Sequence, residues 1–433
     1  MRRPAELGAR AREAAGFTAA VLRALAGDRF LWRLAWRNVW RNGRRAAIVA
    51  TAVAVGIAGV VLSMAINFGM IFQMIETAIS TDLGHVQLHA RGFQDDPGLD
   101  RLLRDGGRGG IEALEGLAEV RAWAPRIRSE GLISSARASA GVRVLAVDPA
   151  REARITSLAD SIVEGEYLDG ARRRLVMGEA LAERLHVEVG AKVVVSATDA
   201  RGDLAGEAFR VAGLFRTASL ELDRSTVYVR LDEGQRLFHV GDTISELVAV
   251  ARSREAIPRV QSALRERLGD DVEVLSWGEL APVLEYFVEI FEQMAWIVYA
   301  AVFVAMAFGI ANVLLMAVFE RTREIGVLRA VGMSGPRVVG MVALESVLLT
   351  LVGLVAGFAL TGLGLFALRD GIDLSRWGQG LNAMGVPTTI VPIVRLADFT
   401  TPSVVALVTA LLAGLWPAVR ASRARPAEAL RHV

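Results

Sequence analysis

The sequence predicts an α-helical membrane protein with four transmembrane helices and an α+β extracytoplasmic domain of two subdomains, inserted between the first and second helices. Three observations predict this class. Of the 433 residues, 53% are hydrophobic, and the mean hydropathy is +0.39, which is too apolar for an ordinary soluble protein. Four runs with at most one charge reach or exceed the about 20 residues that cross a hydrocarbon core. Between the first two runs lie roughly 210 residues of ordinary polar content, enough for a folded domain.

The N-terminal part predicts an interfacial helix followed by the first span. Trp32, Trp36 and Trp40 recur every four residues, and each is followed by an arginine. This pattern is typical of a helix at the inner face of a membrane, with indoles at headgroup depth and guanidinium groups towards the phosphates. The uncharged stretch that follows runs from Ala46 to Ile75. Residues 1–28 are too charged for a cleavable signal peptide, and we interpret them as a loose basic helix or a disordered segment.

Apolar residues keep helical spacing outside the membrane at both borders of the inserted region. Phe68 and Phe72 follow the first span, whereas Phe287 and Phe291 precede the second. Two spans that extend beyond the bilayer in this way predict a stalk that carries the external domain.

Strand-like and helix-like segments alternate in the inserted region, which favours an α+β domain. The order strand, helix, strand near residues 245–275 fits a split βαβ unit. A hairpin with its turn in Thr198 to Gly206, rich in Gly and Asp, is predicted to protrude. The predicted strands are His85 to His89, Arg143 to Val147, Arg174 to Met177, Lys192 to Ser196, Phe209 to Phe215, Thr226 to Val229, Ser245 to Ala251 and Val272 to Leu275; the helices are Ile111 to Glu119, Glu179 to His186, Asp232 to Phe238 and Arg254 to Leu268.

The segment from Glu320 to Arg337, between the second and third spans, is charged and amphipathic. Ile325, Val327, Leu328 and Val331 fall within less than half of a helical wheel. A short helix between two spans needs a surface for its apolar face, and either the headgroup layer or a partner protein provides one.

A second connecting segment follows the third span. Leu374, Trp377, Leu381 and Met384 share about a quarter of a helical wheel, which predicts a helix on the outer membrane surface.

Basic residues that flank the spans set the orientation. They precede the first span, separate the second from the third and follow the fourth, which places both termini and residues 320–337 in the cytoplasm. The net charge of +2 says little about partners. The positive residues of the chain gather at the inner membrane face. This distribution suits binding to anionic lipid and argues against a nucleic-acid partner.

Several kinds of chemistry are absent from the sequence. It has no cysteine, so disulfides and thiolate sites are excluded. It has no G-x-x-x-x-G-K-[ST] motif, so any ATP used must be bound by another subunit. His85 and His89 lie in a predicted strand, about 13 Å apart at 3.3 Å per residue, which argues against a metal pair. No catalytic constellation is recognisable, and we expect a non-catalytic protein without its own cofactor or metal.

Glu345 is the intramembrane polar residue that the sequence singles out. Because a charge inside a span is costly, Glu345 is expected either to reach an interfacial arginine or to serve transport. Gly353, Gly357 and Thr361 form a row of small residues that predicts a close helix contact, and Asn312 is expected to pack similarly.

The sequence resembles a permease family that includes the cell-division protein FtsX, the macrolide exporter subunit MacB and the lipoprotein-releasing permeases LolC and LolE (type VII ABC transporters). The resemblance covers nearly the whole chain, and GHVQLHARGF and GIDLSRWGQGL look most like the LolE-type branch. The segments that carry it are RNVWRNGRR, GHVQLHARGF, VMGEALAERLHVEVGAKV, FERTREIGVLRAVGMSGPRVVGMVALESVLLTLVGLVAG and PAVRASRARPAEALR.

The resemblance implies a dimeric permease, homomeric or heteromeric, bound to a dimer of a separate cytoplasmic ATPase that carries ATP and Mg. It implies that residues 321–333 form a coupling helix in a groove of the ATPase. The residues expected to make this contact are Arg321, Arg323, Glu324, Ile325, Leu328, Arg329 and Met333.

The implied function is ATP-driven extraction of lipoproteins from the outer leaflet of a bacterial inner membrane, for delivery to a periplasmic carrier. The candidate contacts for lipid or cargo are Met64, Phe68, Phe72, Phe287 and Phe291. The candidate partner-binding hairpin contains Asp199, Arg201, Asp203 and Leu204, but it is shorter than the LolC-type hook and has no proline, which leaves carrier binding open. The alternative is a mechanotransmission permease of the MacB or FtsX type, which drives efflux through a periplasmic or outer-membrane partner or activates a cell-wall hydrolase.

The expected organisation follows from these assignments. Residues 1–45 form a cytoplasmic segment with the interfacial Trp/Arg helix, 46–75 the first transmembrane helix and stalk, 76–283 the periplasmic domain, 284–319 stalk and second transmembrane helix, 320–337 the coupling helix, 338–368 the third transmembrane helix, 369–398 a periplasmic loop with an interfacial helix, 399–419 the fourth transmembrane helix and 420–433 a cytoplasmic tail.

Overall fold

The computed structural model describes residues 29–168, 171–377 and 388–422. The chain divides into a helical unit (residues 1–69, 290–372 and 391–433) and a sheet unit (residues 70–289 and 373–390). The predictions for residues 1–28, for most of the outer-surface helix, including Leu381 and Met384, and for the tail after residue 422 lie outside the described residues.

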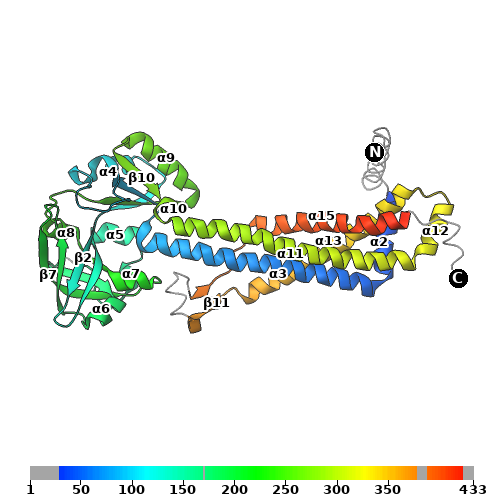
Figure 1. Ribbon diagram of the computed structural model, residues 1–433, viewed down its shortest axis with the longest axis horizontal. Helices are drawn as coiled ribbons and strands as arrows, with labels where there is room; N and C mark the ends of the chain where they lie inside the picture. The colour runs from blue at the N-terminus through cyan, green and yellow to red at the C-terminus, as the bar shows by residue number, and fades with distance from the viewer. Residues whose placement is uncertain (1–28, 169–170, 378–387, 423–433) are drawn as a thin grey trace, which may run out of the picture. The chain divides into compact units, whose positions relative to one another are not determined.

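The helical unit contains long helices that lie side by side (Figure 1). Among the described residues, four helices are long and apolar enough to cross a membrane, and they coincide with the four predicted spans. The helices are α2 (Arg29–Arg41), α3 (Gly43–Ala78), α11 (Pro282–Glu320), α12 (Thr322–Ala330), α13 (Gly335–Ala367) and α15 (Leu396–Ser422). The chain passes from one unit to the other within α3 and again within α11.

Helix α13 lies at the centre of the bundle and packs closely against α3. A Cβ atom on Gly353 would lie 2.5 Å from Cβ of Val53, and one on Gly357 would lie 3.1 Å from the carbonyl oxygen of Ala54. These backbones approach because no side chain separates them, which confirms the predicted close contact. Asn312 differs from the prediction, since it is exposed on α11.

Helix α2 has the two faces expected of an interfacial helix. Leu31, Ala35 and Val39 are buried against the bundle, whereas the three tryptophans of α2 are exposed. The exposed indoles suit contact with lipid headgroups.

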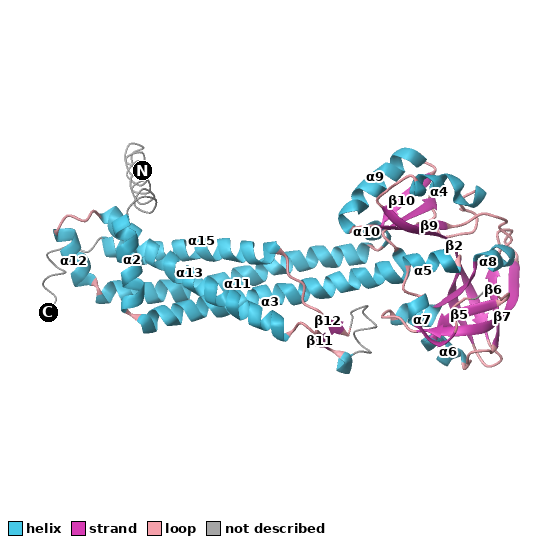
Figure 2. Ribbon diagram, turned by 180° about the vertical axis from the view of Figure 1, so that it is seen from behind, coloured by secondary structure: helices cyan, strands magenta, loops and turns pink. Residues whose placement is uncertain are grey.

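The sheet unit is built on ten strands in one sheet, of order β10-β1-β9-β2-β3-β8-β5-β7-β4, with β6 paired to β2 and β7 (Figure 2). The strands are β1 (Val86–Ala90), β2 (Val120–Ser134), β3 (Ser139–Val147), β4 (Ile162–Gly165), β5 (Arg174–Gly178), β6 (Lys192–Thr198), β7 (Leu204–Phe215), β8 (Thr226–Arg230), β9 (Glu246–Ala251) and β10 (Val272–Ser276). The helices are α4 (Arg108–Glu115), α5 (Pro149–Ile155), α6 (Glu179–Leu185), α7 (Leu220–Ser225), α8 (Leu231–Leu237), α9 (Ile257–Leu268) and α10 (Trp277–Leu280). All of these elements follow α3 and precede α11 in the chain. The division into two subdomains stays a prediction.

Two local topologies match the prediction. Strand β1 is antiparallel to both β9 and β10 and lies between them, so β9, α9 and β10 form a split βαβ unit. Strands β6 and β7 form an antiparallel hairpin in which Thr198 is opposite Leu204.

The largest difference from the prediction is β2, a 15-residue strand that the sequence pattern did not indicate. It contains Arg121, Arg126, Arg128 and Glu130, and charged residues are uncommon in a central strand. The strand nevertheless lies in the interior of the sheet, where it pairs with β3, β6 and β9.

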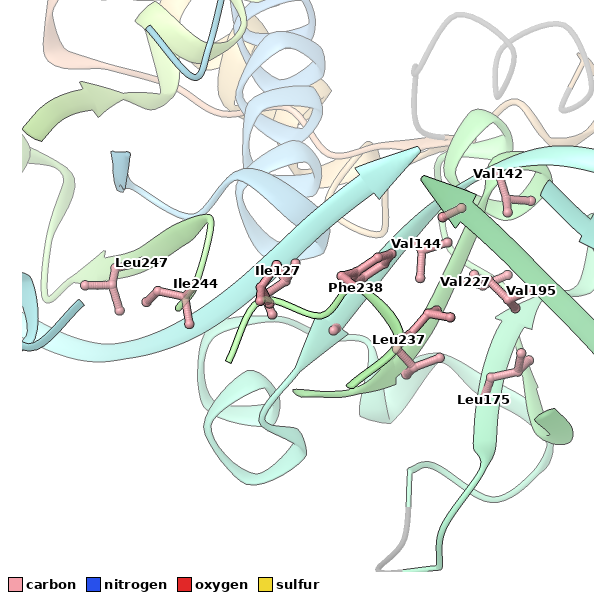
Figure 3. Packing of buried hydrophobic residues seen from close by; sticks show 14 of the residues in the cluster. Ile127, Val142, Val144, Leu175, Val195, Val227, Leu237, Phe238, Ile244 and Leu247 are labelled. Carbon is pink, nitrogen blue, oxygen red and sulfur yellow. The ribbon is translucent and has the colours of Figure 1, made fainter. Parts of the chain in front are cut away.

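The sheet unit has a continuous hydrophobic core. In Figure 3, Leu237 and Phe238, at the end of α8, lie over side chains of the sheet that include Val144, Val227 and Leu175. Leu237 is only 4% exposed, and the other four of these side chains are fully buried. This contact fixes α8 on the sheet.

The connection between α13 and α15 begins differently from the predicted helix. It contains β11 (Ile372–Asp373), a short 3₁₀ turn at Ser375–Trp377 and β12 (Thr389–Ile390). The amide of Leu374 donates to the carbonyl of Thr388, which holds the two short strands together.

Candidate functional site

Arg321 marks the junction between α11 and α12, where the chain leaves the bundle. Its guanidinium lies 3.3 Å from the carboxylate of Glu345 on α13 and donates a 3.2 Å hydrogen bond to the carbonyl of Asn38 on α2. Both side chains are buried. Glu345 therefore reaches an arginine at the end of a span, one of the two outcomes expected from the sequence.

Three further contacts hold α12 against the bundle. Glu324 pairs with Arg41 of α2 at 2.8 Å, and Arg329 donates a 2.6 Å hydrogen bond to the carbonyl of Ser422 on α15. Ile325 is buried in the hydrophobic cluster of the helical unit. Because α12 has only nine residues, these contacts fix which face it exposes.

The structure shows which residues of α12 and of the turn after it are exposed. Arg323, Val327 and Val331 are exposed, and Val331 retains 84% of its accessible surface. Of the residues expected to contact the ATPase, Arg321 and Ile325 face the bundle, whereas Leu328, Arg329 and Met333 are half-buried and Arg323 and Glu324 are exposed. The four apolar residues that the helical wheel groups together are therefore divided in the structure: Ile325 is buried and Leu328 is half-buried, whereas Val327 and Val331 are exposed.

The predicted cargo residues fall in both units. Met64, Phe68 and Phe291 belong to the helical unit, and Phe72 and Phe287 belong to the sheet unit. Guanidinium groups cover two of the rings: Arg395 lies 4.1 Å from the ring centre of Phe68, and Arg254 lies 4.0 Å from that of Phe72.

Phe287 lines a cavity of about 350 Å³ in the sheet unit. Its walls come from the ends of α3 and α11 that belong to this unit and from α7. Apolar side chains, including Met74, Leu222 and Leu284, line one part, and Asp82 and Arg143 line another. Arg143 lies 3.3 Å from Asp82, so the polar part includes an ion pair. A cavity of this composition can hold an apolar chain with a polar end.

The hairpin turn is held by Asp199. Its carboxylate accepts hydrogen bonds from the amides of Arg201 and Asp203, each at 2.9 Å, and lies 2.9 Å from Nδ1 of His239. The turn is thus tied to the end of α8. Leu204 is 81% exposed, and Arg201 and Asp203 are also exposed, so three of the four candidate partner-binding residues are accessible.

A buried ion network in the sheet unit was missed by the sequence reasoning. Arg126 of β2 is fully buried and donates to both carboxylate oxygens of Glu152 on α5, at 2.6 and 3.0 Å, and to the carbonyl of Asp82 at 2.6 Å. Glu246 on β9 is also fully buried and lies 3.5 Å from Arg126 and 3.1 Å from Arg128. Burial alone disfavours the charged guanidinium, but Glu152, Glu246 and Asp82 together outweigh this effect and keep the pKa of Arg126 above its usual value.

This network ties the end of α3 to the sheet. Asp82 lies in η1 (Ile79–Leu83), the π-helical turn that follows α3. No clear signal for this network is present in the sequence, because β2 carries four charged residues and the partners of Arg126 at 152 and 246 are distant in the chain, so that only the fold brings them together.

Other titratable groups have structural roles. Burial lowers the pKa of His85 and of His89; His85 accepts a hydrogen bond from the amide of Ala251, and His89 stacks on Phe93. Burial raises the pKa of Asp223 to about 6, against hydrogen bonds from Thr217 that favour the carboxylate. In the part of the chain that the structure describes, no group of three or more metal-ligating side chains gathers.

Comparisons with known proteins identify the family. A model of the MacB-like periplasmic core domain matches residues 46–267, which is more than half of the chain, and a model of the FtsX-like permease C-terminal region matches residues 296–426. The chain belongs to the MacB/FtsX-like family of ABC transporter permeases. Members of this permease family work with a cytoplasmic ATPase.

Two proteins and one crystal structure show to what this permease is similar. The lipoprotein-releasing system transmembrane protein LolC of Neisseria meningitidis serogroup B is 26% identical over 331 residues, which are 72% of this chain and 78% of that protein. The macrolide export ATP-binding/permease protein MacB of Chlorobium luteolum is 36% identical over 124 residues, which are 29% of this chain and 16% of that protein. The crystal structure of the periplasmic region of MacB from Actinobacillus actinomycetemcomitans is similar over 49% of this chain and 98% of that structure, with 13% identity and a TM-score of 0.35. The preference for the LolE-type branch stays a prediction.

Proposed function

We propose that this permease extracts lipoproteins from the outer leaflet of a bacterial inner membrane and passes them to a periplasmic carrier, powered by a separate ATPase dimer that binds ATP and Mg. In this proposal the sheet unit lies in the periplasm, and a second permease subunit, identical or different, completes the transporter. The chain itself is non-catalytic and carries no cofactor or metal.

The observation that carries the proposal is the cavity beside Phe287. Its apolar part suits an acyl chain, and the Arg143–Asp82 pair suits the polar groups next to such a chain. The similarity to LolC supports the same cargo, because it extends over most of both chains.

Photocrosslinking tests the cargo. A benzoylphenylalanine at Phe287 should capture an acylated lipoprotein in membrane vesicles, and the same lipoprotein without its acyl anchor should not be captured. The matched control is the adjacent Tyr286, which is exposed but does not line the cavity. Equal capture of the anchorless form, or equal capture from both positions, would contradict lipid-anchor recognition.

The exposed face of α12 supports the proposed ATPase contact. Val327 and Val331 are exposed apolar residues near Arg323, which is also exposed, and Val331 retains 84% of its accessible surface. A charge introduced at these exposed apolar positions should disrupt docking without disturbing the buried side of the helix.

A pull-down tests this contact. Val331→Asp should abolish co-purification of the ATPase while membrane insertion and yield stay normal. Val163→Asp places the same charge at an exposed position of β4. It serves as the control and should leave the complex intact. Normal ATPase binding by Val331→Asp would remove the exposed face from the contact.

The second candidate function is mechanotransmission without cargo passing through the chain. It is favoured by the buried network of Arg126, Glu152 and Asp82, which connects η1 to the sheet. Because this connection is rigid, a movement of α3 would be passed to the sheet. Co-purification of an outer-membrane channel or a cell-wall hydrolase, together with no lipoprotein capture at Phe287, would select this alternative.

A further inference from the structure

A second cavity, of about 370 Å³, lies within the helical unit between α12 and the bundle. Its walls come from α2, α11, α12 and α13, and most of them are apolar, as at Leu34, Leu314, Ala317 and Val342. None of the residues that line the proposed cargo cavity lines this space, whereas Val327 of the exposed face of α12 lies at its edge.

The cavity has an open and a closed end. Arg41, Glu324 and Val327 line it and are exposed, so they form its mouth. Arg321 and Glu345 line it and are buried, so they belong to its interior. An apolar space with a charged end excludes a purely polar ligand and fits an amphiphile.

Arg321, which lines the cavity, carries a buried donor without a partner in the described part of the chain. Its Nη atoms contact Glu345 and Asn38, but among the described residues its buried Nε–H has no acceptor. A buried donor without a partner is costly. Because Arg321 lines the cavity, a shift of its side chain towards this space would let an oxygen of a ligand accept from Nε.

The position of the cavity relative to the membrane selects the source of the amphiphile. It adjoins α2, whose exposed Trp32, Trp36 and Trp40 place it at headgroup depth if the four apolar helices span the membrane. A phospholipid at this depth presents phosphate and ester oxygens at the level of its first methylene groups.

We propose that this cavity binds one acyl chain of an inner-leaflet phospholipid, with a phosphate or ester oxygen of the lipid accepting from Arg321 Nε. The acyl chain fills the space between α12 and the bundle. It thereby stabilises the orientation of α12 in which Val327 and Val331 are exposed. The lipid site stands on the cavity itself, whereas its effect on ATPase docking rests on the proposed function.

Lipid photolabelling of the full chain in nanodiscs tests the site. A phosphatidylglycerol with a diazirine on one acyl chain should label peptides that contain residues 314–318 and 341–342. Ala317→Phe fills the cavity, and labelling of these peptides should fall by about tenfold, the factor that corresponds to 1.4 kcal/mol. Met316→Phe, at the adjacent and lipid-exposed position of α11, should label as the wild type does.

The outcomes separate the possible occupants. Equal labelling of wild type and both variants would show bulk lipid contact and overturn the proposal. Labelling by a diazirine fatty acid but not by the phospholipid probe would also overturn it and assign the cavity to a free fatty acid. If Ala317→Phe does not fold, Leu328→Trp, from the opposite wall, should produce the same loss.

A second readout separates this site from the proposed function. If lipid labelling shows the expected loss in Ala317→Phe but the wild-type chain binds no ATPase, the lipid site holds and the coupling role fails. If ATPase binding is normal and labelling is equal in all variants, the coupling role holds and the lipid site fails.

Discussion

Arg126→Met removes the central cation of the buried network in the sheet unit. The wild-type guanidinium makes hydrogen bonds of 2.6 and 3.0 Å to Glu152 and of 2.6 Å to the carbonyl of Asp82, all at a side chain with no accessible surface. After the substitution the buried carboxyl group of Glu152 has lost its arginine partner, and Glu246 retains only Arg128.

Removing one member of a buried ion pair costs about 3–5 kcal/mol, because the remaining charge is left desolvated and unpaired. In hydrogen exchange this cost appears as faster exchange of β2 and β9 amides, by about a hundredfold to several thousandfold if opening of the sheet limits exchange. Mass spectrometry of peptides from the full chain in nanodiscs measures it. The control is Arg121→Met, on the same strand but exposed.

A double variant isolates the unpaired charge as the cause. Arg126→Met combined with Glu152→Leu removes both charges, and it should recover most of the lost protection because an apolar pair replaces an ion pair at little cost. The reasoning is wrong if β2 and β9 exchange in Arg126→Met stays within about tenfold of the wild type, the change expected for a surface pair, or if the double variant exchanges faster than the single one.

Three further predictions concern other parts of the chain. Gly353→Val should reduce folded yield in detergent, since overpacking costs about 1–3 kcal/mol, whereas Gly362→Val, with no atom within 4 Å of a new Cβ, should not; equal yields would contradict the close α3–α13 contact. The raised pKa of Asp223, about 6, means that the folded state binds the proton more tightly than the unfolded state, so this group's contribution to stability is present below pH 4 and is lost as pH rises from about 4 to 6. Thermal unfolding of Asp223→Asn across that range should be flatter with pH than that of the wild type, and parallel curves would refute the assignment. Asp199→Ala should speed amide exchange in the hairpin turn, because the turn amides lose their acceptor, whereas Asp203→Ala should not; equal rates would show that the turn does not depend on Asp199.

The sequence by itself determined the elements with a regular apolar pattern. The four spans, the row of small residues on α13, the strand–helix–strand order near residues 245–275 and the hairpin were all predicted, because each is specified by residues that are near one another in the chain. The amphipathic character of residues 320–337 was also evident, and so was the need of Glu345 for a partner.

Tertiary structure decided what depends on residues distant in the chain. Strand β2 was missed because Arg126 and Arg128 look solvent-exposed until Glu152 and Glu246 are placed beside them. The sequence also left open which residues of α12 are exposed: a wheel shows which residues share a side, but the pairing of Arg321 with Glu345, 24 positions away, helps to decide which of them face the bundle. Pairing of buried charges requires the fold, and periodicity does not encode it.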